Sequence, residues 1–205
     1  MRDRLRVGLV LLLAAACTGE IGDVDPSDPD GGGGGGGDGG GSGGDGGGGT
    51  DAPPVVGEPP GLVGTTDAHN AVRATVGVPP LTWDPALAEV ARAWVIQCVD
   101  QAVPIGLVDH NPGRSDNYPG YVGENIYGSG GQASGTAAVQ LWAAEESSYD
   151  YASNSCSGVC GHYTQIVWRT TTKVGCALHT CPGLQYGSTV VCNYSPGGNT
   201  GGRPY

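Results

Sequence analysis

The stretch GVCGHYTQIVWRTTTKVGCALHTCPGLQYGSTVVCNYSPGGN, from Gly158 to Asn199, decides the fold of this chain. It contains four cysteines, two histidines and two runs rich in β-branched residues, 173–178 and 188–194. Turn residues around Pro182 and Gly183 separate the two runs, which therefore predict an antiparallel strand pair. The density of cysteines predicts that disulfides close this pair beside a polar site.

Helical spacing of apolar residues predicts helices before this stretch. Asp84 is a good N-cap and Pro85 a good first-turn residue for one of them. Prolines at 79–80 end the helix before it. The expected segments are 65–73, 85–98 and 135–149.

The composition divides the 205 residues into three parts. Residues 1–16 carry three arginines followed by a ten-residue apolar run, too short to span a bilayer but typical of an export signal. Residues 17–60 are mostly Gly, Asp, Pro and Ser and predict a disordered tether, because they offer little apolar surface to bury. Residues 61–205 have nearly ordinary composition and predict one globular domain.

Cys17 directly follows three alanines and resembles the lipidated cysteine of bacterial lipoproteins. It lies outside the six cysteines of the domain, so a lipid anchor would account for it. The alternative is an ordinary signal peptide followed by an unpaired thiol. We expect an exported protein, held in the cell envelope by lipid or released outside the cell, with membrane contact through the anchor only.

Charge argues against one class of partner. The net charge of -11 comes largely from residues 18–60, which hold nine of the 20 acidic residues and no basic one. The domain has ten acidic and six basic residues without a basic cluster, so we expect no nucleic-acid partner. We expect a monomer.

Two segments of the opening stretch carry a family resemblance. GHYTQIVW (161–168) and VVCNYSPGGN (190–199) resemble the two signatures of the CAP superfamily, which includes cysteine-rich secretory proteins, venom antigens and plant pathogenesis-related proteins. HNAVR, at 69–73, is similar to the family's first helix. The resemblance implies an α+β fold, the CAP-type α-β-α sandwich with a small antiparallel sheet between helices. It also implies that 161–168 is a short helix, although its alternating pattern alone is typical of a strand.

The same resemblance implies a polar cavity. Carried over onto this sequence, its lining is His110, Glu124, Glu145 and His162, the last two from WAAEESSY and GHYTQ. Two neutral imidazoles can bind Zn or another divalent cation, while carboxylates hold the second ring nitrogens or join the coordination. The alternative is a buried polar network that only orients the loops.

The remaining candidates are interpreted as structural. His69 is expected to be a hydrogen-bonded helix residue and His179 a solvated one, and Gln165 is expected to support the backbone. The four tryptophans are expected in the core, although one could line a groove. They are Trp83, Trp94, Trp142 and Trp168.

Six domain cysteines allow fifteen disulfide pairings. Cys176 and Cys192 are symmetric about Leu184 and can face each other across the strand pair, and Cys156 and Cys160 can close a short loop. This leaves Cys98 for Cys181, and the family resemblance implies the same pattern.

Residues 61–205 contain neither the Gly-x-Ser-x-Gly elbow of covalent catalysis nor the His-Glu-x-x-His motif of metalloproteases. The favoured function is a secreted, surface-tethered binding module without strong enzymatic activity, with a divalent cation in its cavity and a groove for a lipid, a sterol or another extracellular ligand. The alternative is a metal-assisted, peptidase-like hydrolase in which Glu124 or Glu145 is the general base.

Overall fold

The computed structural model describes residues 57–103 and 105–205. The predicted export signal, Cys17 and most of the predicted tether lie outside these residues. No helix in the described part of the chain is both long and apolar enough to cross a membrane.

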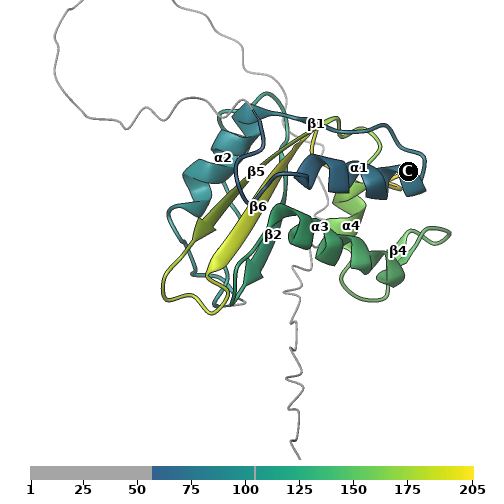
Figure 1. Ribbon diagram of the computed structural model, residues 1–205. Helices are drawn as coiled ribbons and strands as arrows, with labels where there is room; N and C mark the ends of the chain where they lie inside the picture. Colours follow the sequence, from purple (N-terminus) through teal and green to yellow (C-terminus); the bar gives the residue numbers. More distant parts are fainter. Residues whose placement is uncertain (1–56, 104) are drawn as a thin grey trace, which may run out of the picture.

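A four-stranded sheet lies at the centre of the domain (Figure 1). Its strands, in the order β1-β5-β6-β2, are β1 (Thr82–Trp83), β5 (Lys173–Thr180), β6 (Ser188–Ser195) and β2 (Gly123–Ser129). The predicted pair, β5 and β6, is antiparallel and forms the middle of the sheet. The sheet as a whole is mixed rather than antiparallel as expected, because the short β1 pairs with β5 in parallel.

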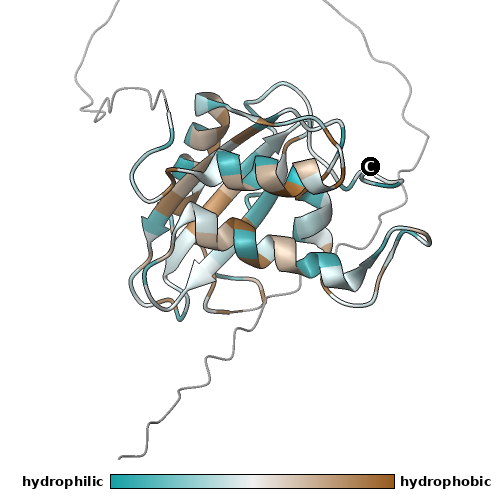
Figure 2. Cartoon of the chain, turned by 45° about the vertical axis from the view of Figure 1, so that its right-hand side comes forward, coloured by the Kyte–Doolittle hydropathy of each residue, from teal (hydrophilic) through white to brown (hydrophobic). Residues whose placement is uncertain are grey.

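Helices cover both faces of the sheet (Figure 1). The helix α2 (Pro85–Val95) lies on one face, and α1 (Thr65–Thr75), α3 (Gly135–Ala144) and α4 (Gly161–Ile166) lie on the other. Hydrophobic and hydrophilic residues alternate along these helices, as expected where one side of a helix packs on a sheet and the other meets water (Figure 2). The fold is therefore the α+β sandwich expected from the sequence.

Each face of the sheet has its own core. On the α2 side, Ala91 and Val95 pack against Ile126 and Val191. On the other side, the larger cluster includes the fully buried Trp142 among residues of α3, α4 and the strands. The sheet therefore separates two apolar layers, and side chains of β2 reach one or the other according to their position in the strand.

Local sequence signals predicted some of the helix ends correctly, but not all of them. The Asp84 carboxylate accepts hydrogen bonds from the backbone N–H groups of Ala86 and Leu87, so α2 begins where the sequence predicted. The prediction that the third helix continues to Tyr149 is wrong. The α-helix ends at Ala144, a 3-10 turn (Glu145–Ser148) follows, and Tyr149 begins β3 (Tyr149–Asp150), which pairs with β4 (Ser155–Cys156).

Three disulfides are present: Cys98–Cys181, Cys156–Cys160 and Cys176–Cys192. This is the pairing that the strand register and the family resemblance implied. Cys176 and Cys192 are direct partners in the ladder between β5 and β6. Cys98–Cys181 joins the chain after α2 to the tip of the hairpin.

Candidate functional site

The four residues predicted to line the cavity form two histidine–carboxylate pairs. His110 Nδ1 lies 2.8 Å from Glu124 Oε1, and His162 Nδ1 lies 2.6 Å from Glu145 Oε1. In each pair a carboxylate holds one ring nitrogen of the imidazole. The tautomer with the proton on Nδ1 follows, and Nε2 is then the nitrogen that would bind a metal ion.

The two pairs approach the edge strand β2 from opposite faces of the sheet. Glu124 lies in β2 two residues before Ile126, whose side chain packs on the α2 side. Glu145 begins the 3-10 turn after α3, on the other side, and reaches His162 in α4. Because β2 is the last strand of the sheet, the two sides meet around its edge.

All four oxygens of the two carboxylates have hydrogen-bond partners. Glu124 Oε1 also accepts from the backbone N–H of Asn111 at 2.9 Å, and its Oε2 lies 3.0 Å from the amide of Asn193, once that amide is oriented to satisfy both of its neighbours. Glu145 Oε2 accepts from the backbone N–H groups of His162 and Tyr163. The side chain of Glu124 is fully buried. These contacts fix the carboxylates as supports for the two imidazoles.

His162 is held from two further directions. Its ring stacks on the buried Trp142, with centroids 6.0 Å apart and planes 17° apart. Its backbone carbonyl accepts from Asn125 Nδ2 at 3.1 Å. Asn125 was not among the site residues expected from the sequence. Its position in Gly-Glu-Asn could have indicated it, because strand alternation places it opposite Glu124.

A buried polar chain continues from Asn125 into the core. Asn125 Nδ2 also donates to the Tyr194 hydroxyl at 3.2 Å, and that hydroxyl lies 2.8 Å from His69 Nε2. His69 Nδ1 lies 2.8 Å from the carbonyl oxygen of Thr65. His69 is thus a hydrogen-bonded core residue, as expected, and supports the site from a distance.

One cavity of about 580 Å³ has both histidines on its wall. Glu124 and Gln165 line it too, whereas Glu145 is not among the lining residues. Gln165 Oε1 accepts from the backbone N–H of Gly198, so this side chain supports the backbone as predicted. Arg114 was not among the residues expected in the cavity, and it is the cavity's Lys or Arg residue within the described part of the chain.

A second, mostly apolar pocket of about 370 Å³ meets the same two histidines. Its wall contains the side chains of Trp94, Leu107 and Ile126. Trp94 is therefore a groove-lining tryptophan, the alternative that the sequence left open. Trp142 and Trp168 are buried, although Trp168 also lines the larger cavity. The imidazoles thus lie where a polar cavity and an apolar pocket join.

A second possible metal site lies elsewhere in the described residues 57–103 and 105–205. It is the one group there of three His, Cys, Asp or Glu residues whose potential ligand atoms all lie within 4.8 Å of one another. This group, Cys98, His179 and Cys181, could hold a metal ion. Cys98 and Cys181 form a disulfide, so they would offer thiolate ligands only after reduction. A metal at His110 and His162 would instead have two imidazole ligands and complete its coordination with water or a bound molecule.

Known proteins with similar sequences or structures support this description of the fold. Pathogenesis-related protein 1 of Arabidopsis thaliana is 42% identical over 141 residues, which are 68% of this chain and 79% of that protein. The structure of venom allergen-like protein 4 of Schistosoma mansoni matches with a TM-score of 0.55 and 28% identity, covering 72% of this chain and 94% of that one. The crystal structure of NaASP2 with Zn2+ matches with a TM-score of 0.53 and 23% identity, covering 74% and 88% of the two chains, and shows a shared fold.

The model of the CAP family, described as the cysteine-rich secretory protein family, matches residues 66–194. This range contains both histidine–carboxylate pairs, and the description of the family as secretory supports export of the chain. The chain belongs to the CAP, or cysteine-rich secretory protein, family.

Proposed function

We propose that this chain is a surface-tethered CAP module that binds a divalent cation of the zinc type through His110 and His162. The observation that carries the proposal is the bond from each Nδ1 to a carboxylate, 2.8 Å at Glu124 and 2.6 Å at Glu145. Such a bond fixes the tautomer and makes the other ring nitrogen a better metal ligand. A bound ion would supply Lewis-acid character and open coordination positions.

The carboxylate contacts favour a binding module over a metal-assisted hydrolase. A general base must have an oxygen in reach of the water that it deprotonates. The oxygens of Glu124 and Glu145 already accept hydrogen bonds from imidazoles, backbone N–H groups and an amide. Peptide and ester substrates, tested with zinc and with a chelator, distinguish the two functions: we expect no turnover that depends on zinc, and such turnover would support the hydrolase.

The apolar pocket beside the histidines supports an amphiphilic extracellular ligand. An apolar segment of a lipid or a sterol would lie against Trp94 and Ile126, and its polar end would meet the cation at His110 and His162. Burying an apolar group there is favourable by about 25 cal/mol per Å². We expect a fatty acid to bind more tightly when zinc is present, which tryptophan fluorescence can measure.

The metal proposal is tested by calorimetry with zinc at neutral pH. His110→Ala or His162→Ala should each remove most of the affinity, because neither imidazole suffices alone. Glu124→Gln and Glu145→Gln should reduce it by about 10 to 100-fold, the usual effect of losing an orienting partner. Affinity should fall in acid, because protons compete with the metal ion for the imidazole nitrogens.

His179→Ala is the matched control, because His179 lies outside the cavity and belongs to the His/Cys group. It should leave zinc binding unchanged. If His179→Ala abolishes binding while His110→Ala and His162→Ala retain it, the metal site is the His/Cys group and the proposal is wrong. If the parent protein binds no zinc, the two pairs are a structural network.

The tether and its anchor remain part of the proposal. Cys17 follows an apolar run and three alanines, and the Gly-rich residues after it would let the domain extend from a membrane. A Cys17→Ser variant should move from the membrane fraction to the soluble fraction of expressing cells. Retention of the variant in the membrane would contradict lipid anchoring.

A further inference from the structure

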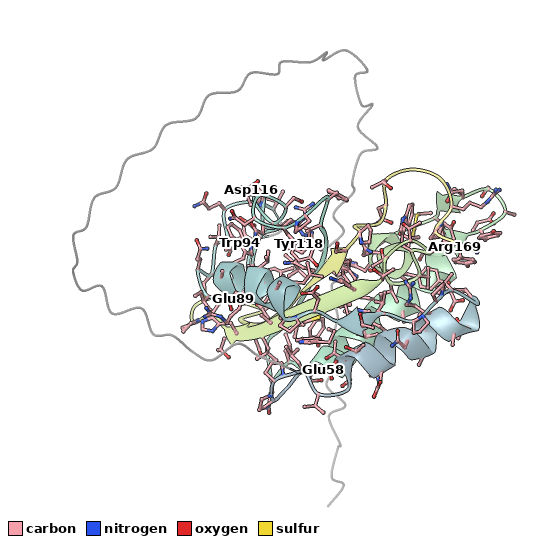
Figure 3. All side chains as sticks on the ribbon, turned by 90° about the horizontal axis from the view of Figure 1, so that it is seen from above. Glu58, Glu89, Trp94, Asp116, Tyr118 and Arg169 are labelled. Carbon is pink, nitrogen blue, oxygen red and sulfur yellow. A yellow bond between two sulfur atoms is a disulfide. The ribbon has the colours of Figure 1, made fainter. Side chains whose placement is uncertain are left out.

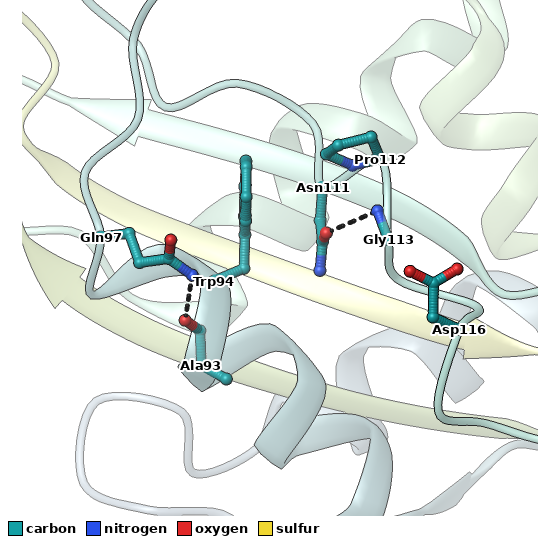
Figure 4. Close-up of a pocket in the computed structure, with 7 residues that line it drawn as sticks. All are labelled: Ala93, Trp94, Gln97, Asn111, Pro112, Gly113 and Asp116. Carbon is teal, nitrogen blue, oxygen red and sulfur yellow. Dashed lines mark hydrogen bonds between the residues drawn. The ribbon is translucent and has the colours of Figure 1, made fainter.

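A further pocket lies beside α2 and shares Trp94 and Pro112 with the apolar pocket that meets the two histidines. It is an open pocket with a volume of about 490 Å³. We call it the Trp94 pocket. It is lined by Ala93, Trp94, Gln97, Asn111, Pro112, Gly113 and Asp116, none of which lines the histidine cavity (Figure 4).

The indole of Trp94 forms one wall of this pocket and is held in place. Its Nε1 donates to the backbone carbonyl of Asp109 at 2.7 Å, so its polar atom has a partner and its ring is left as an apolar surface. Figure 4 shows the ring edge-on, with the side chain of Asn111 across the pocket from it. Figure 3 places Trp94 and Asp116 on the α2 side of the molecule, far from Arg169.

Three planar polar groups line the pocket together with the ring. Asn111 Oδ1 accepts from the backbone N–H of Gly113 at 2.9 Å, and its Nδ2 makes no hydrogen bond to another described residue. Gln97 Nε2 donates to the carbonyl of Ala93 at 2.7 Å, which leaves Oε1 as an acceptor. The Asp116 carboxylate lies over Gly113, where a Cβ atom would come within 2.7 Å of Oδ2. The pocket therefore offers both donors and acceptors beside an aromatic surface.

The wall opposite Trp94 is rigidly connected to the rest of the fold. The backbone N–H of Asn111 donates to Glu124 Oε1, the oxygen that also holds His110. Arg114 Nη1 donates to the carbonyl of Asn111 at 2.8 Å, and Arg114 Nε donates to the carbonyl of Val122. These bonds form the wall before any ligand arrives, so less ordering entropy opposes binding.

The lining excludes several ligand classes. It contains no Lys, Arg or His, and the Asp116 carboxylate repels anions, which argues against phosphates and sulfated polymers. A fatty chain would bury the Asn, Gln and Asp groups without hydrogen bonds, which is unfavourable. An extended peptide pairs with a free strand edge, whereas a helix and a turn form this pocket.

We propose that the Trp94 pocket binds a neutral saccharide. A sugar ring has a face of polarised C–H groups, which the electron-rich face of an indole attracts. Its edge carries hydroxyl groups, each of which donates and accepts hydrogen bonds and can pair with Asn111 Nδ2, Gln97 Oε1 and the Asp116 carboxylate. The lining of this pocket includes neither His110 nor His162, so saccharide binding does not require a bound metal ion.

The test is titration of the full-length protein with cellotriose, maltotriose and triacetylchitotriose, followed by tryptophan fluorescence and calorimetry. At least one should bind, and Trp94→Ala should weaken that binding by at least about 10-fold, since removing the ring removes the stacking surface. Gln97→Ala and Asp116→Ala each remove one hydrogen-bond partner and should weaken it by about 3 to 10-fold. Both are exposed side chains, so these two variants decide the matter if Trp94→Ala fails to fold.

Gln140→Ala is the matched control, because Gln140 is an exposed glutamine on α3. It should leave saccharide affinity unchanged, because Gln140 is not part of this pocket. The proposal is overturned if none of the three trisaccharides binds. It is also overturned if binding survives unchanged in the Gln97 and Asp116 variants, which would place the sugar elsewhere.

Discussion

His69 is a buried histidine whose two ring nitrogens have fixed roles. Nδ1 faces a carbonyl oxygen, which can only accept, so Nδ1 carries the proton. Nε2 then accepts from the Tyr194 hydroxyl, because that oxygen already accepts from Asn125. Burial lowers the pKa of His69 from 6.5 to about 4 and also raises the pKa of Tyr194, so both groups stay neutral across the ordinary pH range.

This depressed pKa predicts a loss of stability in mild acid. The unfolded chain binds a proton at His69 below about pH 6.5, whereas the folded chain does so only near pH 4. The unfolded state therefore binds more protons between these values, and the free energy of unfolding should fall by about 3 kcal/mol as the pH drops through this window. Urea unfolding at pH 7, 5.5 and 4 measures the effect.

The His69→Gln variant should show a flatter dependence of unfolding free energy on pH than the parent, because it removes the titrating group. His179→Gln serves as control, since His179 lies on the hairpin outside the buried chain. An equally steep dependence in His69→Gln would mean that other groups cause the loss of stability in acid.

Gly175 sets how closely α2 packs on β5. A Cβ atom at this position would lie 2.2 Å from the backbone nitrogen of Ala88 and 2.4 Å from the carbonyl oxygen of Asp84. Both contacts are with backbone atoms, so the clash could not be relieved by rotating a side chain. The first turn of α2 therefore rests directly on the strand, and Asp84 can cap the helix while its carboxylate also bonds Lys173 and Tyr118.

Gly175→Ala should lower the free energy of unfolding by about 3 kcal/mol or more, because α2 must move away from the sheet. Gly161→Ala is the matched control: nothing lies within 4 Å of a Cβ atom there, and the backbone is not in the left-handed region. Its unfolding free energy should change by less than about 1 kcal/mol. Chemical denaturation of both variants measures the difference, and similar stabilities would refute this account of the packing.

At the scale of the whole molecule, the disulfides differ in the length of chain that they close. Cys98–Cys181 spans 83 residues, and Cys156–Cys160 spans 4. By loop-closure entropy, replacing the first pair with serine should lower the free energy of unfolding by about 4 to 5 kcal/mol, and replacing the second by about 2 kcal/mol. Thermal and chemical unfolding of the two double-serine variants measures the difference. Equal losses would mean that the long disulfide does not act through chain entropy.

Local sequence signals were enough to predict the positions of several helices and strands. The Asp84–Pro85 pair placed the start of α2, and the symmetry of Cys176 and Cys192 about Leu184 placed the central strand pair in register. The segment 161–166 shows the opposite case. Its alternating pattern is typical of a strand, yet it is helical, and Glu145 accepts from the first backbone N–H groups of this helix. The family resemblance, not the pattern, predicted this helix.

What the sequence determined by itself is therefore the set of helices and strands that short-range signals specify. The family resemblance selected the two histidines and two glutamates as candidates. Only the tertiary structure decided that His110–Glu124 and His162–Glu145 reach the edge of β2 from opposite faces of the sheet. It likewise decided that Trp94 lines two pockets. The physical reason is that these positions depend on strand order and on contacts between residues far apart in the chain, which a local pattern does not encode.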